Sequence, residues 1–202
     1  DFDQMPSLQL LDLASNQLSG SLPDFSNLTN ITNLLFDDNN LSGVIPDYSL
    51  IMASLNELGV NDNDFTFDDF LLNFDNIQTH IDNNFIAGSN GYEIIPQGKV
   101  GSVADTTIAV YSTNFTIQLN IDDTVTTNTY EWFKDGNLIG TTTEPEFILS
   151  NYSASDNGVY QASVTNSVVG GLTLESNNFT LMMGSGEICG NSTDDDGDGL
   201  ID

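Results

Sequence analysis

The first ninety residues carry one spacing of apolar side chains three times. An apolar residue stands at the first, fourth and sixth positions of each copy, and Asn stands at the ninth; the copies begin at Leu8, Ile31 and Leu55. Successive copies are offset by 23 and then 24 residues. A repeat of this period predicts a solenoid, in which each copy contributes a short strand and buries its apolar side chains against the next copy.

The repeat also carries a recognisable motif after its Asn. Residues 18–23 read Leu-Ser-Gly-Ser-Leu-Pro, and residues 41–46 read Leu-Ser-Gly-Val-Ile-Pro. This pattern resembles the leucine-rich repeat, in the subtype common in plant-type repeats. We expect Asn16, Asn39 and Asn63 to form an inward ladder that satisfies backbone groups at the turns. The pattern decays after Phe65, so we interpret residues 66–90 as a degenerate last repeat and cap, with His80 as a cap or surface residue.

The hydrophobic pattern changes from about Val100 onward. Short β-branched and aromatic runs alternate apolar with polar residues, and turn residues such as Asp135-Gly136 separate them. These runs cover residues 115–121, 130–139, 147–149, 155–166, 172–175 and 179–181. Several short alternating strands with turn signals between them predict a β-sandwich.

Residues within these runs resemble the immunoglobulin-like domain over about 97–183. Trp132 matches the buried tryptophan of that family, and Asp156-Asn-Gly158-Val-Tyr160 matches its turn and tyrosine corner. The usual disulfide is absent, since Leu119 and Ala162 stand near the places of its two cysteines. The resemblance implies that this aliphatic pair fills part of the space over the tryptophan.

The charge of the chain limits its partners and its environment. Thirty Asp and Glu residues stand against two Lys and no Arg, for a formal net charge of -28, while 39% of residues are hydrophobic. Such a charge repels nucleic acid and anionic membranes, and no stretch is long and apolar enough for direct membrane insertion. Because salt and bound cations screen self-repulsion, we expect a secreted or cell-surface location in salty, calcium-containing medium. Simple solubility is the alternative reading.

The end of the chain has the pattern of a calcium loop. Asp194, Asp196 and Asp198 alternate and Gly199 follows, which is how an oxygen-lined loop begins and turns around the ion. Asp202 is a further candidate ligand, although the twelfth position of an EF-hand-type loop falls beyond it. The sequence therefore predicts calcium as cofactor, bound by a truncated loop. A solvated acidic tail is the alternative.

The order of these parts also has a family resemblance. Leucine-rich repeats, then a cysteine-free immunoglobulin-like region, then the acidic loop, resemble large secreted surface proteins of gliding and marine bacteria. The loop is also similar to thrombospondin type 3 and dockerin repeats, which implies a spacer or attachment role. In such tails a cysteine commonly follows the final Asp, which implies that Cys189 forms a disulfide with a partner beyond residue 202.

Acidic residues also gather at the variable positions of the predicted repeat strands. The candidates for ligand binding on this concave face are Asp12, Asp37, Asp38, Asn61 and Asp62. Neighbouring strands lie about 4.8 Å apart, and like charges this close favour a cation between them. We hypothesise that Asp37, Asp38 and Asp62 hold calcium, or grip a cationic or polyhydroxyl ligand. A solvated acidic face is the alternative.

Catalysis has little support in the composition. With one His, one Cys, two Lys and no Arg, most nucleophilic and acid–base constellations cannot be assembled. We therefore do not expect an enzyme.

These observations predict a mainly β chain. Leucine-rich repeats and their cap occupy residues 1–90, a linker 91–99, an immunoglobulin-like β-sandwich 100–184, and the calcium loop 185–202. The predicted function is an extracellular adhesion or ligand-binding segment, stabilised by calcium, whose partner is a surface glycan or protein. The alternative is a structural spacer or filament segment that contacts further domains or copies of the same protein.

Overall fold

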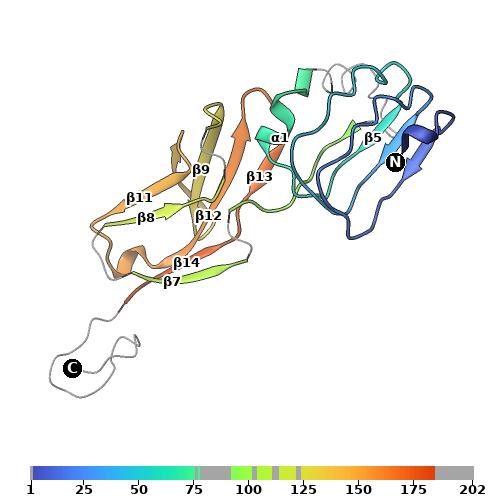
Figure 1. The fold of residues 1–202 in the computed structure, drawn as a ribbon. Helices are drawn as coiled ribbons and strands as arrows, with labels where there is room; N and C mark the ends of the chain where they lie inside the picture. Colours follow the sequence, from blue (N-terminus) through green and yellow to red (C-terminus); the bar gives the residue numbers. More distant parts are fainter. Residues whose placement is uncertain are drawn as a thin grey trace.

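The computed structural model describes residues 2–75, 77, 92–101, 104–110, 114–121 and 124–184. The candidate calcium ligands and Cys189 lie outside these residues, as does His80. The described chain is elongated and mainly β, with the repeat unit at one end and the sandwich at the other (Figure 1). No helix among the described residues is long and apolar enough to cross a membrane.

The first unit stacks three coils of chain through parallel strands, and we use the word solenoid as a name for this stack of coils alone. Strands β1 (Leu10–Asp12), β3 (Asn33–Leu35) and β5 (Glu57–Gly59) pair in parallel, with Leu11 opposite Leu34 and Leu34 opposite Leu58. These paired leucines are 23 and 24 residues apart, which is the repeat spacing of the sequence. The short strands β2 (Ser19–Gly20) and β4 (Asn40–Leu41) form a second parallel pair, and η1 (Phe2–Gln4) precedes β1.

The apolar repeat positions fill the space between the coils. Ile31, Leu34 and Leu58 are fully buried. The ring of Phe25 stacks on Phe36 with centroids 5.6 Å apart, and Phe2 of η1 covers Phe25 from the other side at 5.4 Å. The solenoid core therefore combines stacked aliphatic side chains with an aromatic row.

The asparagines form the predicted ladder where two coils meet. The amide of Asn63 donates to the backbone oxygens of Phe36, Val60 and Asn61, while its side-chain oxygen accepts from the N–H of Leu41. Asn39 makes the equivalent contacts one coil earlier and accepts from the N–H of Leu18. Asn16 is exposed, and its side chain donates only within its own turn. Thus the ladder prediction holds for the two inner asparagines.

A short helix covers the last coil. Helix α1 (Phe67–Leu71) begins after Thr66, whose N–H donates to the Asp69 carboxylate at 2.9 Å. Burial raises the pKa of Asp69, because only 6% of this residue is exposed. Buried Phe67, Phe70, Phe74 and Ile77 seal the end of the apolar core.

The segment expected to be a plain linker, 91–99, contributes to the solenoid sheet. Strand β6 (Tyr92–Glu93) pairs in parallel with β5, opposite Leu58 and Gly59. The side chain of Gln97 then donates to the backbone oxygens of Val60 and Ile94. The physical reason is that the outer edge of β5 carries backbone groups that need partners, and this returning segment supplies them.

The second unit is a two-layer sandwich. Its larger sheet has the order β10-β9-β12-β14-β7, with β13 also paired to β12, and its smaller sheet pairs β11 with β8. All neighbouring pairs are antiparallel except β14 with β7. The elements are β7 (Thr106–Val110), β8 (Asn114–Gln118), β9 (Asn128–Lys134), β10 (Asn137–Thr142), β11 (Glu146–Ser150), η2 (Ala154–Asp156), β12 (Gly158–Asn166), β13 (Thr173–Glu175) and β14 (Phe179–Met183).

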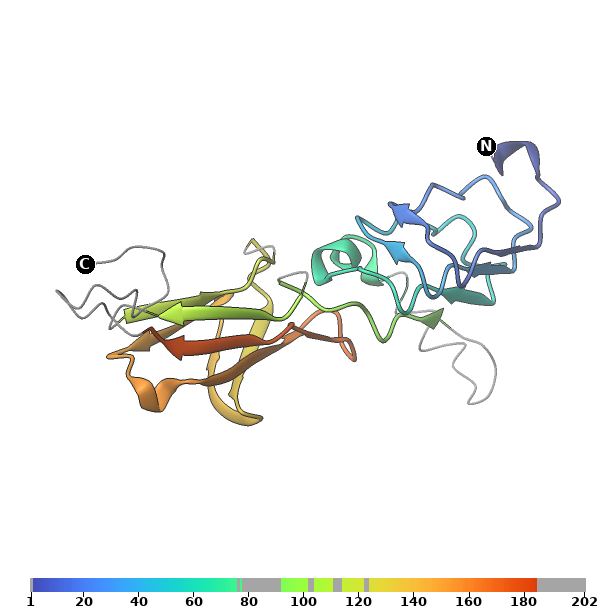
Figure 2. The ribbon, with the colours of Figure 1, turned by 90° about the horizontal axis from the view of Figure 1, so that it is seen from below.

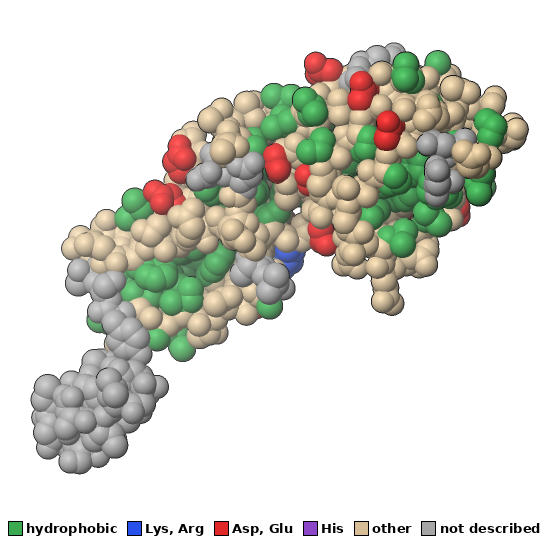
Figure 3. Space-filling model, viewed as in Figure 1, with side chains coloured by type: hydrophobic (Ala, Val, Ile, Leu, Met, Phe, Trp, Pro, Cys, Tyr) green, Lys and Arg blue, Asp and Glu red, His purple; other side chains and the backbone are tan. Residues whose placement is uncertain are grey.

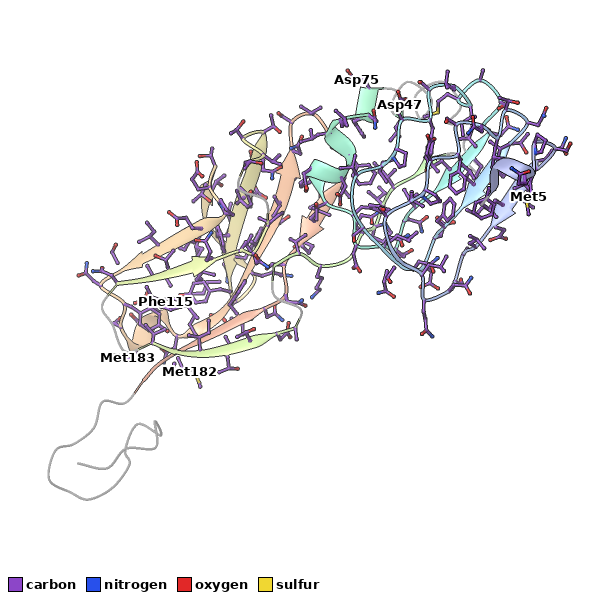
Figure 4. All side chains as sticks on the ribbon, viewed as in Figure 1. Met5, Asp47, Asp75, Phe115, Met182 and Met183 are labelled. Carbon is purple, nitrogen blue, oxygen red and sulfur yellow. The ribbon has the colours of Figure 1, made fainter. Side chains whose placement is uncertain are left out.

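The core of the sandwich surrounds Trp132, which is fully buried. Its indole N–H donates to the hydroxyl of Thr142 at 2.9 Å. Leu119 and Ala162 are buried as well, at the places where the family resemblance expects cysteines. Toward the end of the sandwich away from the solenoid, Phe115 lies between the sheets, and Met182 and Met183 lie at the end of β14 (Figure 4).

Two local features fix the connections of this unit. Asp135 and Gly136 both have positive φ, at 49° and 76°, which suits the two-residue turn between β9 and β10. The hydroxyl of Tyr160 donates to the backbone oxygen of Asp156 at 2.6 Å, which forms the predicted tyrosine corner.

The two units meet end to end through residues 94–101 (Figure 2). The N–H of Gly98 donates to the backbone oxygen of Asn63 in the solenoid. Two residues later, the N–H of Val100 donates to the backbone oxygen of Glu175 in the sandwich, at 2.9 Å. Since Val100 also forms a β-bridge with Ser176, the connection is hydrogen-bonded to both units.

Candidate ligand-binding site

The predicted acidic positions lie on the outward side of the solenoid sheet, which we call the sheet face. Asp12, Leu35 and Gly59 align across β1, β3 and β5. The next positions along the coils continue this alignment, because the N–H of Asp38 donates to the backbone oxygen of Asn61. The structure thus brings Asp37 and Asn61 onto neighbouring coils, on one face.

Asp37 and Asn61 each have a buried side-chain oxygen on this face. The carboxylate of Asp37 lies directly over Gly59, where there is no room for a Cβ atom. The side-chain oxygen of Asn61 is buried and accepts no hydrogen bond from any described residue. A buried carbonyl oxygen without a donor carries a desolvation cost, and a rotation of the Asn61 side chain toward the surface would relieve that cost by exposing the oxygen to a donor.

Asp38 and Asp62 have a backbone role that the sequence reasoning did not recognise. Their φ angles are 56° and 52°, and Ser15 has 53° at the same position of the first coil. All three lie in the left-handed region, which Asp and Asn tolerate better than most residues. Each stands directly before a ladder asparagine, and this shared position is the signal that could have indicated the turn.

Asp12 occupies the outermost described strand. It is exposed, and its Oδ1 accepts from the N–H of Ala14 at 3.1 Å. One oxygen of this carboxylate therefore shapes the end of β1, while the side chain still borders the sheet face.

The sheet face does not assemble a metal centre from its carboxylates. Among the described residues, no three Asp, Glu, His or Cys side chains come together in a way that could hold a metal ion. The hypothesised calcium bridge between Asp37, Asp38 and Asp62 therefore has no support in this geometry. The tail ligands Asp194, Asp196, Asp198 and Asp202 lie outside the described residues.

Charge is distributed unevenly over the surface. On the face drawn in Figure 3, acidic side chains appear on both units, and the basic colour appears as a small patch near the narrowing between them. Lys99 lies in that connection. Lys134 donates to the backbone oxygen of Ser155 at 2.6 Å, so it stabilises a turn of the sandwich.

Two hollows lie outside the sheet face. One, of about 460 Å³, opens at the junction and is lined by residues from both units, including Asp64, Asp68, Lys99 and Asn120. The other, of about 570 Å³, lies beside β10 in the sandwich. It is lined by Thr129, Thr141, Thr142, Thr143, Glu144, Glu146, Phe147 and Ile148, and we call it the β10 groove.

The described residues offer little for acid–base or nucleophilic catalysis. The chain's one His and one Cys, His80 and Cys189, lie outside them. A serine or cysteine nucleophile activated by histidine can therefore not be built from the described part of the chain.

Comparison with known families identifies the second unit. A family model described as "Immunoglobulin domain" matches residues 105–182. This range contains Trp132 and the Tyr160 corner, and it falls almost entirely within the sandwich. The sandwich is an immunoglobulin-like domain. The match covers less than half of the chain, so it describes this domain and not the solenoid.

Solved structures with similarity to part of the chain include the following three. Extracellular domains 3–5 of Drosophila OTK are 14% identical, with 43% of this chain and 35% of that chain covered and a TM-score of 0.32. The V domain of amphioxus IgVJ-C2 is 15% identical, with coverage of 40% and 98% and a TM-score of 0.31. Immunoglobulin domains 1–5 of Sidekick-1 are 12% identical, with coverage of 44% and 19% and a TM-score of 0.32.

The chain covers only part of the length of two of these structures. The chain spans about a third of the OTK fragment and about a fifth of the Sidekick-1 fragment. No curated protein matches the chain in sequence. The function must therefore be argued from the chain's own surfaces.

Proposed function

We propose that this chain is an extracellular ligand-binding segment of a secreted or cell-surface protein, in which a leucine-rich-repeat solenoid is joined to the immunoglobulin-like domain. The leucine-rich-repeat assignment is supported by the parallel coils at 23- and 24-residue spacing and by the buried asparagine ladder. The partner we propose is a surface glycan or protein. The high acidic charge supports a location where salt screens it.

The observation that carries this proposal is the polar group at Asp37 and Asn61. Once the Asn61 side chain rotates toward the surface, its oxygen would accept a hydrogen bond from a ligand hydroxyl or N–H, and the neighbouring carboxylate of Asp37 would accept a second. Hydroxyl-rich sugars and the backbone and side chains of proteins both carry such donors. The sheet face therefore supports direct recognition without a bridging calcium ion.

Calcium enters the proposal through the tail alone. The alternation of Asp194, Asp196 and Asp198 before Gly199 supports a calcium loop, with Asp202 as a further ligand. We expect calcium to order residues 190–202 and chelation to loosen them. Limited proteolysis with calcium and with chelator tests this, and equal cleavage of the tail in both conditions would contradict it.

The spacer alternative is supported by a different observation. Residues 94–101 are hydrogen-bonded to the solenoid through Gly98 and to the immunoglobulin-like domain through Val100. Such a connection suits a segment that holds other domains at a fixed separation. A binding segment can use the same rigidity to present its sheet face, so the connection alone does not distinguish the two functions.

An array of glycans and cell-surface proteins distinguishes them. The folded chain is applied with calcium and again with chelator, and folding is checked by circular dichroism in both buffers. Binding to a defined ligand in both conditions is the expected result. Binding only with calcium would show that recognition depends on a bound calcium ion and not on the polar group of Asp37 and Asn61 alone. No binding from a folded sample would favour the spacer.

A further inference from the structure

The β10 groove combines a free sheet edge with a hollow of ligand size. Strand β10 ends the strand order of the larger sheet, so its outer edge pairs with no described strand. Strand β11 pairs with β8 on one side, and its other edge pairs with no described strand. The chain passes from β10 to β11 through residues 143–145, and the groove of about 570 Å³ lies beside this crossing. Free edges present backbone N–H and C=O groups that can pair with another chain.

Only part of the edge is suited to such pairing. The register between β10 and β9 shifts between Leu138 and Gly140, and a bulge of this kind obstructs addition of a further strand. The regular stretch comprises residues 140–142, and it borders the groove through Thr141 and Thr142. An extended peptide rises about 3.3 Å per residue, so a segment of roughly five residues would follow this stretch and the crossing.

The floor of the groove is fixed by contacts that do not depend on a ligand. The ring of Phe147 packs against Trp132, with centroids 5.6 Å apart. It also lies over Gly140, where an added Cβ would be 2.8 Å from the ring. The Thr142 hydroxyl accepts from Trp132 and donates to the backbone oxygen of Glu144 at 2.7 Å. A preformed site of this kind loses less entropy on binding.

The rim of the groove is apolar and exposed. Ile148 is 59% exposed and lines the groove, and Leu138 at 56% and Ile139 at 39% lie at the start of the same edge strand. A bound peptide would cover part of this surface with its own apolar side chains. Alternating side chains of a strand suit this arrangement, because one side would meet Ile148 and the other would face away.

The charge of the lining selects the partner. Glu144 and Glu146 line the groove, no Lys or Arg does so, and the whole chain has only two basic residues. A second copy of the chain would bring its own net charge of -28 and the same two glutamates to the contact. A partner with Lys or Arg is attracted instead, and guanidinium groups can bind carboxylates through two hydrogen bonds.

We propose that the β10 groove binds an extended peptide segment of a partner protein, one that alternates basic with apolar residues and pairs with the backbone of residues 140–142. This site lies in the immunoglobulin-like domain and is separate from the sheet face. It goes beyond the proposed function, because the sheet face can bind its ligand whether or not the groove is used. The proposal gives the domain a partner of its own.

The test is a titration of the isotope-labelled chain followed by NMR, with three blocked five-residue peptides as probes. One alternates valine with arginine, one alternates valine with glutamate, and one is the arginine peptide with N-methyl groups along one edge. We expect the arginine peptide alone to shift the amides of Gly140, Thr141, Thr142 and Ile148, with binding that weakens as salt is raised. N-methylation removes the donors that strand pairing needs.

Charge variants provide the matched comparison. Glu144→Gln and Glu146→Gln should each weaken binding about two- to fivefold, the range for an exposed charge pair. Glu175→Gln removes one charge from an exposed position of strand β13 in the same domain, outside the groove lining, and should leave the affinity unchanged. Equal weakening by all three variants would show attraction to the net charge and overturn the site.

Further outcomes of the peptide titration would also overturn the proposal. The proposal is wrong if no peptide shifts these amides, or if the glutamate or N-methylated peptide binds as tightly as the arginine peptide. It is also wrong if cellobiose shifts the groove amides and the arginine peptide does not, since the groove is then a saccharide site. Shifts that grow with protein concentration in the absence of peptide would assign the groove to a second copy.

Discussion

The solenoid and the immunoglobulin-like domain differ in how far they rely on side chains to satisfy buried backbone groups. In the solenoid, Asn63 alone holds three backbone oxygens and one backbone N–H. In the immunoglobulin-like domain, long strands pair their backbones directly, as β9 and β12 do over seven residue pairs from Asn128 to Lys134. The solenoid's strands are only two or three residues long, so they need the ladder.

This difference indicates which substitutions should destabilise each unit most. The immunoglobulin-like domain concentrates its packing around one large side chain, Trp132, which is fully buried. The solenoid spreads its stability over repeated positions, so the same substitution should have different effects in an inner and an outer coil.

The largest effect is expected at Trp132. Trp132→Ala removes the central side chain of the immunoglobulin-like domain and should lower its free energy of unfolding by about 3–5 kcal/mol. Phe133→Ala, at the next and half-buried position of β9, should cost clearly less. Unfolding by denaturant, followed in each unit separately by hydrogen exchange, measures the loss of stability in both variants. Equal losses would show that packing is not concentrated at the tryptophan.

The ladder predicts the next largest effect, in the solenoid. Asn63→Ala leaves the buried Leu41 N–H without its acceptor and removes one of the two amide donors to the Phe36 oxygen, which should cost about 2–4 kcal/mol. Asn16→Ala changes the same repeat position in the exposed first coil and should cost less than about 0.5 kcal/mol. If both variants unfold at the same denaturant concentration, the ladder does not stabilise the inner coils.

A smaller effect is expected at the left-handed turn residue Asp38. Asp38→Val places a β-branched residue at a φ of 56° and should destabilise the solenoid by about 1–2 kcal/mol. Asp38→Asn removes the charge but keeps a residue that tolerates this φ, so stability should be unchanged. Thermal unfolding of the two variants separates backbone strain from charge, and equal stability of Val and Asn variants would exclude the strain.

The smallest effect concerns Tyr160 and alkaline pH. Burial, followed by the charge of Asp156, raises the pKa of Tyr160 to about 12, above its ordinary value of 10.0. The folded state therefore keeps a proton that the unfolded state loses, and this contribution to stability is present below pH 10 and disappears as pH rises toward 12. Tyr160→Phe should cost about 1 kcal/mol at neutral pH and reduce the loss between pH 10 and 12. An unchanged slope in urea unfolding at these pH values would contradict the assignment.

Local patterns in the sequence were sufficient to predict much of both units. The repeat spacing predicted which leucines pair across the parallel strands, because a solenoid places equivalent positions side by side. Trp132 and the Tyr160 corner predicted the immunoglobulin-like core, because few residues can fill those positions. The ladder roles of Asn39 and Asn63 followed from the same spacing.

The remaining features depend on contacts between distant segments. Strand β6 is two residues long and has no periodicity, so its pairing with β5 could not be read from the sequence. The β10 groove forms only when the edges of two different sheets lie together. The enclosed position of Asp37 depends on Gly59, 22 residues further along the chain, and the grouping of Asp37 with Asp38 and Asp62 missed the turn geometry of the latter two.

The most direct test of the binding proposal compares two neighbouring carboxylates on one coil. Asp37→Asn and Asp38→Asn each remove one charge, and both variants are applied with the parent chain to the ligand array. We predict that Asp37→Asn weakens binding by at least about tenfold, or about 1.4 kcal/mol, while Asp38→Asn binds as the parent does. Equal binding by all three chains would contradict the assignment of the ligand site to the sheet face.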